Sequence, residues 1–203
     1  MKSVRIIAGS YRGRVIPFDV RKFNDADITP QKVKEALFSI LGDINGKYFL
    51  DLFGGSGQVG FEAVSRGAKG VVINESDRRR YEFIRHYATQ FPEAERPQVL
   101  NYPAFRALRF LHNRERYFDF IYIDPPYEKI SGKVPVYVEI LDEVGRYRDI
   151  CEKAVVVLQH FSANELDRNI RGFSFIKRRD YGSTALSFYK FVTQDTDNTI
   201  DNI

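Results

Sequence analysis

Cysteine is nearly absent from this chain of 203 residues, and long apolar runs are absent altogether. The single cysteine, Cys151, cannot form a disulfide within the chain, which fits a reducing cytoplasm. No apolar stretch approaches the roughly 20 residues of a membrane span, and the N-terminus lacks the apolar core of a signal peptide. These absences predict a cytoplasmic protein rather than a secreted or membrane protein.

Histidine is also scarce, and its three positions are dispersed along the chain. His86, His112 and His160 have no metal-ligand spacing among them, so we interpret each as a surface or core residue and predict no metal site. The chain shows no internal repeat and no low-complexity segment. A hydrophobic fraction of 43% and this length are enough for one α/β domain with a full core and a modest appendage.

Positive charge gathers near the N-terminus. The first 18 residues contain no acid, and their basic residues are Lys2, Arg5, Arg12 and Arg14. The last ten residues contribute three aspartates and no base, so the rest of the chain carries +7, against +4 for the whole. A basic arm on a folded domain is typical of nucleic-acid binding, although a solvated surface would have the same charge.

Residues 1–28 are expected to form a β-hairpin arm, because two short strand patterns flank a glycine-containing turn. Thr29 and Pro30 then fit the N-cap and the first position of a helix. The apolar stripe of that helix is Val33, Leu37, Phe38 and Leu41. Lys32 and Lys34 are expected off this stripe, where they could meet solvent or phosphate.

From residue 47 onward, strand and helix patterns alternate. Strands are expected at 48–52, 70–74, 98–101, 118–123 and 154–159, and helices at 57–66, 78–91, 104–113 and 134–146. Such alternation is typical of a parallel sheet covered on both faces. Two last strand patterns, 173–178 and 185–192, have no helix between them and predict an antiparallel hairpin at the sheet edge. We therefore predict an α/β, Rossmann-like fold with a mostly parallel seven-stranded sheet over residues 29–193, followed by a disordered tail at 194–203.

The run from Asp51 to Gly60, DLFGGSGQVG, holds a G-x-G-x-x-G pattern between a predicted strand and a predicted helix. Glu75 lies 20 positions after Gly55, where it could accept hydrogen bonds from both ribose hydroxyls of a nucleotide-like cofactor. The pattern alone is compatible with a structural turn, a nicotinamide dinucleotide or S-adenosylmethionine. Asp51 favours S-adenosylmethionine, because a carboxylate suits its ammonium and sulfonium groups and would repel a pyrophosphate.

We expect the cofactor to contact the glycine loop and the ends of the second and third strands. The predicted contacts are Asp51, Phe53, Gly55, Gly57, Gly60, Glu75, Asn101 and Ala104. Among these, Asn101 is the candidate for holding the adenine amine, because its side chain is polar. Pro103 is poorly suited to this contact, since it has no amide hydrogen.

A second motif, DPPY at residues 124–127, follows the apolar strand pattern at 118–123. Asp124 and the Pro125 carbonyl can accept the two hydrogens of an exocyclic amine, which would localise the lone pair on nitrogen. Pro126 stiffens the loop, and Tyr127 offers a ring for a flipped-out base. A plain β-turn would also explain the motif, but its place after the fourth strand and downstream of the glycine loop favours methyl transfer to an amine.

The two motifs together resemble those of class I S-adenosylmethionine-dependent N-methyltransferases. The segments at 5–14 and 29–38 and the closing hairpin at 182–189 resemble the RsmD family of bacterial 16S rRNA guanine-N2 methyltransferases. This resemblance covers roughly residues 4–192. It implies a class I methyltransferase domain and, as substrate, a guanine of the small-subunit rRNA in an assembling particle.

We assign RNA binding to basic residues of the arm and the first helix: Arg5, Arg12, Arg14, Lys32 and Lys34. The sequence departs from the family at Asp27-Ile28, where the family has Arg-Pro, and at Pro103, where it has an acidic or amide residue. Two alternatives stay open. One is an adenine-N6 DNA methyltransferase, disfavoured because no separate target-recognition domain is visible, and the other is a non-catalytic RNA-binding assembly factor of the same fold.

Overall fold

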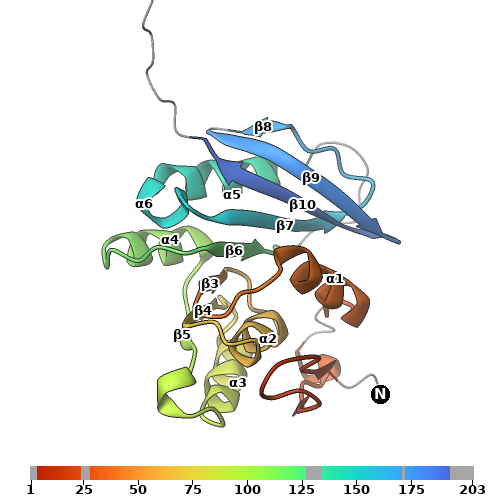
Figure 1. Ribbon diagram of the computed structural model, residues 1–203, viewed down its shortest axis with the longest axis vertical. Helices are drawn as coiled ribbons and strands as arrows, with labels where there is room; N and C mark the ends of the chain where they lie inside the picture. Colours follow the sequence, from red (N-terminus) through yellow and green to blue (C-terminus); the bar gives the residue numbers. More distant parts are fainter. Residues whose placement is uncertain (1–3, 24–27, 127–133, 171, 193–203) are drawn as a thin grey trace, which may run out of the picture.

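The computed structural model describes residues 4–23, 28–126, 134–170 and 172–192, and its centre is one large sheet with helices on both faces (Figure 1). The strands are β1 (Val4–Arg5), β2 (Val15–Ile16), β3 (Tyr48–Asp51), β4 (Gly70–Asn74), β5 (Gln98–Leu100), β6 (Phe120–Ile123), β7 (Val155–Phe161), β8 (Asn169–Ile170), β9 (Phe173–Tyr181) and β10 (Thr184–Phe191). The α-helices are α1 (Gln31–Leu41), α2 (Gln58–Ser65), α3 (Arg78–Ala88), α4 (Ala104–His112), α5 (Pro135–Arg146) and α6 (Arg148–Cys151), with 3-10 turns η1 (Val20–Phe23) and η2 (Glu93–Glu95).

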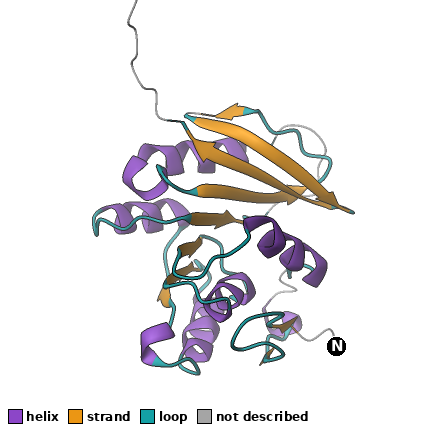
Figure 2. Ribbon diagram, in the orientation of Figure 1, coloured by secondary structure: helices purple, strands orange, loops and turns teal. Residues whose placement is uncertain are grey.

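The large sheet has the strand order β5-β4-β3-β6-β7-β10-β9-β8. The first five of these are mutually parallel, whereas β10 runs antiparallel to β7 and β9 antiparallel to β10 (Figure 2). The predicted seven strands and the closing hairpin are therefore confirmed. The two-residue strand β8 adds an eighth at the edge, and it is too short to leave a pattern in the sequence.

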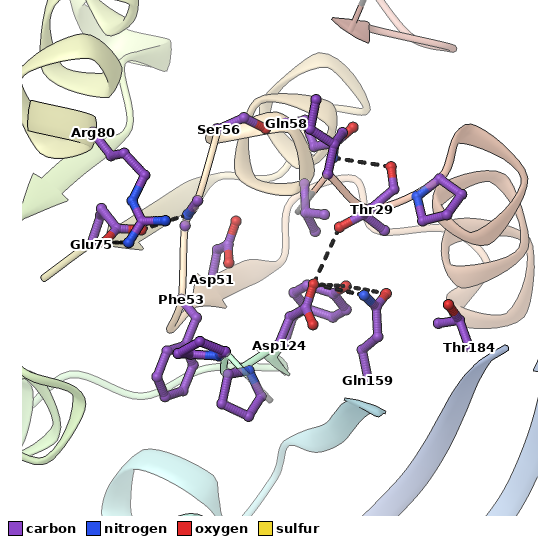
Figure 3. Close-up of a pocket in the computed structure, with 18 of the residues that line it drawn as sticks. Thr29, Asp51, Phe53, Ser56, Gln58, Glu75, Arg80, Asp124, Gln159 and Thr184 are labelled. Carbon is purple, nitrogen blue, oxygen red and sulfur yellow. Dashed lines mark hydrogen bonds and ion pairs between the residues drawn. The ribbon is translucent and has the colours of Figure 1, made fainter. Parts of the chain in front are cut away.

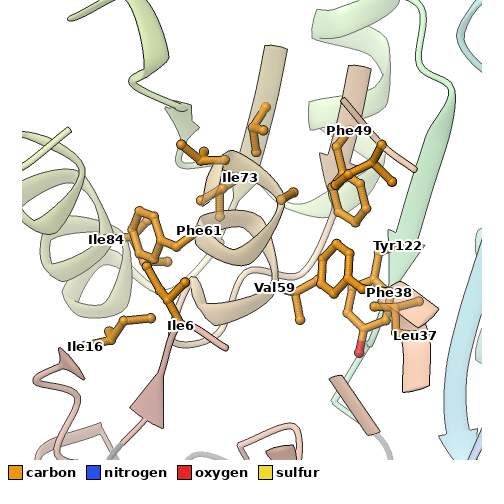
Figure 4. Packing of buried hydrophobic residues seen from close by; sticks show 14 of the residues in the cluster. Ile6, Ile16, Leu37, Phe38, Phe49, Val59, Phe61, Ile73, Ile84 and Tyr122 are labelled. Carbon is orange, nitrogen blue, oxygen red and sulfur yellow. The ribbon is translucent and has the colours of Figure 1, made fainter. Parts of the chain in front are cut away.

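Successive side chains of the parallel strands enter two different cores. Phe49 belongs to the core that the sheet forms with α1, α2 and α3 on one face (Figure 4). Its neighbour Leu50 belongs to the core formed with α4, α5 and α6 on the other face. This alternation follows from the period of two in a strand, and it explains why the strands are apolar throughout. Cys151 lies in the second core, where burial raises the pKa of its thiol to about 12. The thiol therefore stays protonated at neutral pH, and Cys151 packs as a small core residue.

The N-terminal hairpin is packed against α2. Val4, Ile6 and Ile16 belong to the same hydrophobic cluster as the helices of the first face (Figure 4). Glu62 of α2 accepts hydrogen bonds from the backbone amides of Ile7 and Ala8, at 2.7 and 3.0 Å. The arm is thus held by both apolar and polar contacts, and its treatment as a unit separate from residues 29–193 stays a prediction.

The expectation that Lys34 is free to meet solvent is wrong. Its side chain is 1% exposed, and its ammonium donates to the Arg5 carbonyl at 2.6 Å and lies 3.5 Å from Glu62. Burial lowers the pKa of Lys34, and the charge of Glu62 opposes that shift. The reason is helical geometry: Lys34 precedes Leu37 and Phe38 by three and four positions, so it lies on the apolar face.

The histidines occupy surface and core positions, as expected. His86 and His112 are exposed, whereas His160 is buried and hydrogen-bonds to Ser187 at 2.9 Å. Within the described ranges, no group of three or more histidine, cysteine or acidic side chains is placed to hold a metal ion. None of the helices in those ranges combines the length and the hydropathy that crossing a bilayer requires.

Candidate active site

A pocket of about 470 Å³ lies at the C-terminal ends of β3, β4 and β6 (Figure 3). The strand order reverses here, because β4 and β5 continue from β3 in one direction and β6 and β7 in the other. Ligands of open α/β sheets bind at such a switch point. The loops after β3 and β6 carry the two sequence motifs, so the fold brings Asp51 and Asp124 into one pocket.

The glycine loop makes the tight turn from β3 into α2. Gly57 has a left-handed φ of +76° and is the N-cap residue of α2. A Cβ on Gly60 would lie 2.4 Å from Cγ1 of Ile73 in β4, so the missing side chain lets α2 approach the sheet. Gly55 lines the pocket, whereas Gly57 and Gly60 shape the turn behind it.

Asp51, the last residue of β3, is 1% exposed. Its Oδ2 accepts a hydrogen bond from the Gly60 amide at 3.1 Å, but its Oδ1 has no hydrogen-bond partner among the described residues. Burial raises the pKa of Asp51 to about 8, and the charges of Asp124 and Glu75 add to the rise. A cationic ligand would both satisfy the orphaned oxygen and favour the ionised carboxylate.

Glu75 follows β4 and ties the glycine loop to the start of α3. It accepts hydrogen bonds from the amides of Gly55 at 2.8 Å and Asp77 at 2.7 Å, and Arg80 lies 3.3 Å from it. Burial raises the pKa of Glu75, while these backbone donors and Arg80 act against the rise. Arg80 also lines the pocket, and its Nε has no hydrogen-bond partner in the part of the chain that is described.

The third strand, β5, contributes less to the pocket than expected. Asn101 donates from Nδ2 to the carbonyls of Glu75 and Ser76, at 2.8 and 3.0 Å. Its amide nitrogen therefore supports the loop after β4. Neither Asn101 nor Ala104 lines the pocket, whereas Phe53 does. An adenine contact by Asn101 stays a prediction.

The DPPY motif begins directly after β6. Asp124, Pro125 and Pro126 all line the pocket, together with Gly54 and Gly55 of the glycine loop. Tyr127 lies outside the described residues. The motif's role in catalysis stays a prediction.

Three side chains from different segments contact the Asp124 carboxylate (Figure 3). Its Oδ2 accepts hydrogen bonds from Gln159 Nε2 at 2.7 Å and Thr29 Oγ1 at 3.3 Å. The Tyr122 hydroxyl oxygen lies 3.4 Å from the same atom. Gln159 lies in β7, Tyr122 in β6, and Thr29 precedes α1. The sequence interpretation missed Gln159 and Tyr122 as site residues, and only the apolar setting of these polar side chains in strand patterns could have indicated them.

Thr29 does not cap the first helix, contrary to the prediction. The helix begins at Gln31, its N-cap is Pro30, and no side chain completes a capping hydrogen bond. The Thr29 hydroxyl donates to Asp124 instead, and its carbonyl accepts from Gln58 Nε2 at 3.1 Å. The threonine is thereby built into the pocket wall.

The closing hairpin also reaches the pocket. Ser183, in the turn between β9 and β10, and Thr184, the first residue of β10, line it. Figure 3 shows Thr184 on the far side of the pocket from Glu75. The Ser183 carbonyl accepts a hydrogen bond from the Ser162 amide at 2.9 Å, which holds the turn against the end of β7. The sequence predicted this hairpin but not its part in the site.

The predicted RNA-binding residues differ in their surroundings. Arg5, Arg12 and Lys32 are exposed. Arg14 is half-buried, and its guanidinium carbon lies 4.4 Å from the ring centroid of Tyr11, a cation–π contact. Arg14 therefore also serves packing, and RNA binding by all four stays a prediction.

A protein-family model described as "Conserved hypothetical protein 95" matches residues 4–190. The "Putative rRNA methyltransferase YlbH" of Bacillus subtilis is 30% identical over 188 residues, covering 92% of this chain and 98% of that protein. The "Ribosomal RNA small subunit methyltransferase D" of Escherichia coli strain K12 is 29% identical over 189 residues, covering 92% of this chain and 89% of that protein.

Solved structures give the same picture for the architecture. The "Putative methyltransferase yhhF" of Escherichia coli matches with a TM-score of 0.71 and 25% identity, covering 95% of this chain and 100% of that one. The family match at residues 4–190 includes the N-terminal hairpin as well as the sheet. The chain belongs to the family described as Conserved hypothetical protein 95, together with YlbH and the small subunit methyltransferase D proteins, and it has the methyltransferase fold.

Proposed function

We propose that this protein uses S-adenosylmethionine to methylate the exocyclic N2 amine of a guanine in small-subunit rRNA. The observation that carries the proposal is the buried, unpartnered Oδ1 of Asp51 in the same pocket as Asp124. The first carboxylate suits a cationic methyl donor, and the second suits an amine acceptor. The relatives named above are rRNA methyltransferases by description, which supports RNA as the substrate.

The charges of the pocket fit this cofactor better than a pyrophosphate. Asp51, Glu75 and Asp124 line it, against a single guanidinium, that of Arg80, among the described lining residues. Asp51 would face the cationic methionine end, and Glu75 would accept hydrogen bonds from the ribose. Bound S-adenosylmethionine supplies an activated methyl group on a sulfonium.

The Asp124 loop would hold the target amine. Asp124 and the Pro125 carbonyl accept its two hydrogens, so the nitrogen lone pair is localised instead of delocalised into the base ring. Asp124 also stabilises the positive charge that develops on nitrogen. Pro125 and Pro126 restrict the backbone, so that these acceptors need little reorganisation.

The choice of guanine N2, and of an assembling subunit as the substrate, rests on the family resemblance alone, whereas the description of the Escherichia coli relative supports small-subunit rRNA. The exposed Arg5, Arg12 and Lys32 support an RNA substrate, because arginine and lysine side chains neutralise phosphates. The pocket by itself would also accept an adenine N6 amine, since both amines present two hydrogens.

One experiment tests the proposal. The protein is incubated with labelled S-adenosylmethionine and, in parallel, under-methylated small subunits, free 16S rRNA and DNA, and the labelled base is mapped. We expect label on guanine N2 in the subunits. Asp124→Ala should bind S-adenosylmethionine as wild type does and transfer no methyl group. Label on DNA adenine, or calorimetry without S-adenosylmethionine binding, would contradict the proposal.

A further inference from the structure

Gln159 hydrogen-bonds to both Tyr122 and Asp124 in the pocket wall, and Figure 3 shows it beside Asp124. Its Nε2 donates to Asp124 Oδ2 at 2.7 Å, and its Oε1 accepts from the Tyr122 hydroxyl at 2.7 Å. Gln159 is 4% exposed and Tyr122 is 1% exposed, so water competes little for either hydrogen bond. The three side chains form one chain of hydrogen bonds that ends on the predicted catalytic carboxylate.

The sheet fixes the geometry of this chain. Tyr122 of β6 pairs in register with Val157 of β7, so Asp124 and Gln159, each two residues further, extend from the same face of neighbouring strands. On its other side Gln159 pairs with Leu186 of β10. Backbone ladders on both sides of β7 therefore set where the Gln159 amide lies.

The chemistry of the groups gives the chain a direction. An ionised carboxylate only accepts hydrogen bonds, so Gln159 must present its NH₂ group to Asp124. Its carbonyl then needs a donor, which the Tyr122 hydroxyl supplies. The tyrosine has one proton, and the 2.7 Å contact to Gln159 is shorter than its 3.4 Å contact to Asp124. If the Gln159 amide were flipped, its Oε1 would face Asp124 Oδ2, and both of these oxygens are hydrogen-bond acceptors.

We propose that Gln159 is a positioning residue for methyl transfer, which holds Asp124 ionised and oriented toward an exocyclic amine. This role rests on the proposed function, since it presumes that Asp124 accepts the amine hydrogens. Gln159 acts through Asp124 and needs no contact with the substrate. Tyr122 orients Gln159 in turn.

Two variants of residue 159 separate positioning from packing. Gln159→Leu keeps a side chain of similar size but removes the donor, and a hydrogen bond to a charged group contributes about 1.5–3 kcal/mol, so kcat should fall about 10- to 100-fold. The KM for S-adenosylmethionine should stay within about twofold of wild type, because the loss acts on the chemical step.

The second variant, Gln159→Glu, can replace the donor only while the Glu–Asp pair shares a proton. Its activity should therefore fall as pH rises through the titration of that pair, where wild type stays active.

The titration of Asp124 gives a readout that does not need methyl transfer. The other charged or titratable groups near Asp124 are Asp51, Glu75 and Arg80, which share its pocket, and Tyr122, which contacts its carboxylate. All four are retained in the variants, so a change in the titration midpoint of Asp124 would come from residue 159. Carbon-13 NMR of the Asp124 carboxyl should show a midpoint about 1–2 pH units higher in Gln159→Leu than in wild type. Thermal melting would confirm that each variant is folded.

The outcomes distinguish the two proposals. An unchanged carboxyl midpoint in a folded Gln159→Leu protein would overturn the positioning role, whether or not wild type is active. A wild-type kcat in Gln159→Leu would also overturn it. A shifted midpoint together with a wild-type protein that methylates no nucleic acid would support the hydrogen-bond chain and contradict the proposed function.

Discussion

The Thr29 hydroxyl donates a hydrogen bond to Asp124 across 3.3 Å, although the two residues are 95 positions apart. Thr29 follows the N-terminal arm directly and precedes α1. Gln58 of α2 donates a hydrogen bond to the Thr29 carbonyl at 3.1 Å. Thr29 therefore connects α2, which follows the glycine loop, to the predicted catalytic loop. The segment that joins the arm to α1 is therefore a wall of the pocket.

Thr29→Val should lower the rate of methyl transfer, because it removes one of the donors to Asp124 and keeps the shape of the side chain. A single hydrogen bond of this length contributes about 1 kcal/mol, so we expect a roughly fivefold lower single-turnover rate. Thr29→Ser retains the hydroxyl and is the matched control. Equal rates for the valine and serine variants would show that the contact has no part in catalysis.

Binding of S-adenosylmethionine should release a proton from Asp51. Burial raises the pKa of Asp51 to about 8, so at pH 7 the ligand-free carboxyl is mostly protonated. A cation beside it favours the charged form and lowers this pKa, so the proton leaves on binding. Calorimetry at pH 7 in buffers of different ionisation enthalpy should give binding heats that vary linearly with that enthalpy. The slope gives the number of protons released, which should be at most one.

The control for that measurement is Asp51→Asn, which keeps the acceptor toward the Gly60 amide but cannot ionise. It should bind S-adenosylmethionine at least tenfold more weakly, given about 1.5–3 kcal/mol for a charged contact, and its heats should not depend on the buffer. Buffer-independent heats in wild type would show that Asp51 does not ionise on binding.

Arg12→Ala should weaken RNA binding without destabilising the protein, because Arg12 is exposed. Losing one phosphate contact lowers the slope of log affinity against log salt by about 0.7–0.9. Arg14→Ala should also lower the melting temperature, since Arg14 stacks on Tyr11 and donates to the Gln90 carbonyl at 3.3 Å. Salt-dependent RNA binding measures the lost phosphate contact in each variant, and thermal melting measures the loss of stability expected only in Arg14→Ala. An unaltered slope in Arg12→Ala would place the RNA elsewhere.

The docking of the arm on α2 can be tested at two glycines. Gly9 and Gly13 have similar left-handed φ values, +81° and +86°, so alanine strains both backbones by about 1–2 kcal/mol. A Cβ at Gly9 would lie 1.7 Å from the Ser65 carbonyl oxygen, whereas at Gly13 nothing lies within 4 Å. Gly13→Ala should therefore lower the melting temperature by about 2–8 °C, and Gly9→Ala by clearly more.

Hydrogen exchange completes that comparison. The amides of Ile7 and Ala8 donate to Glu62, and the Ser10 amide donates to the Ser65 carbonyl at 2.8 Å. These three amides should exchange faster in Gly9→Ala and stay protected in Gly13→Ala. Equal protection in the two variants would mean that the arm does not depend on this close approach.

The sequence alone determined the alternating architecture and the position of the two motifs. Alternation of strand and helix patterns encodes a parallel sheet, and in such a sheet the loops after neighbouring strands meet at one edge. Asp51, Glu75 and Asp124 each follow or end a strand pattern, so their meeting in one pocket could be predicted without coordinates.

Only the tertiary structure decided which polar side chains serve the carboxylates. Gln159 contacts Asp124 because β7 pairs with β6 in one register. Thr29 contacts it because the segment before α1 lies beside the loop that follows β6. Neither arrangement leaves a local pattern in the sequence. Lys34 shows both levels: helical spacing places it on the apolar face of α1, but its partners there, Glu62 and the Arg5 carbonyl, come from other segments of the chain. Local periodicity sets elements and faces, whereas partners far apart in the chain depend on how those elements pack.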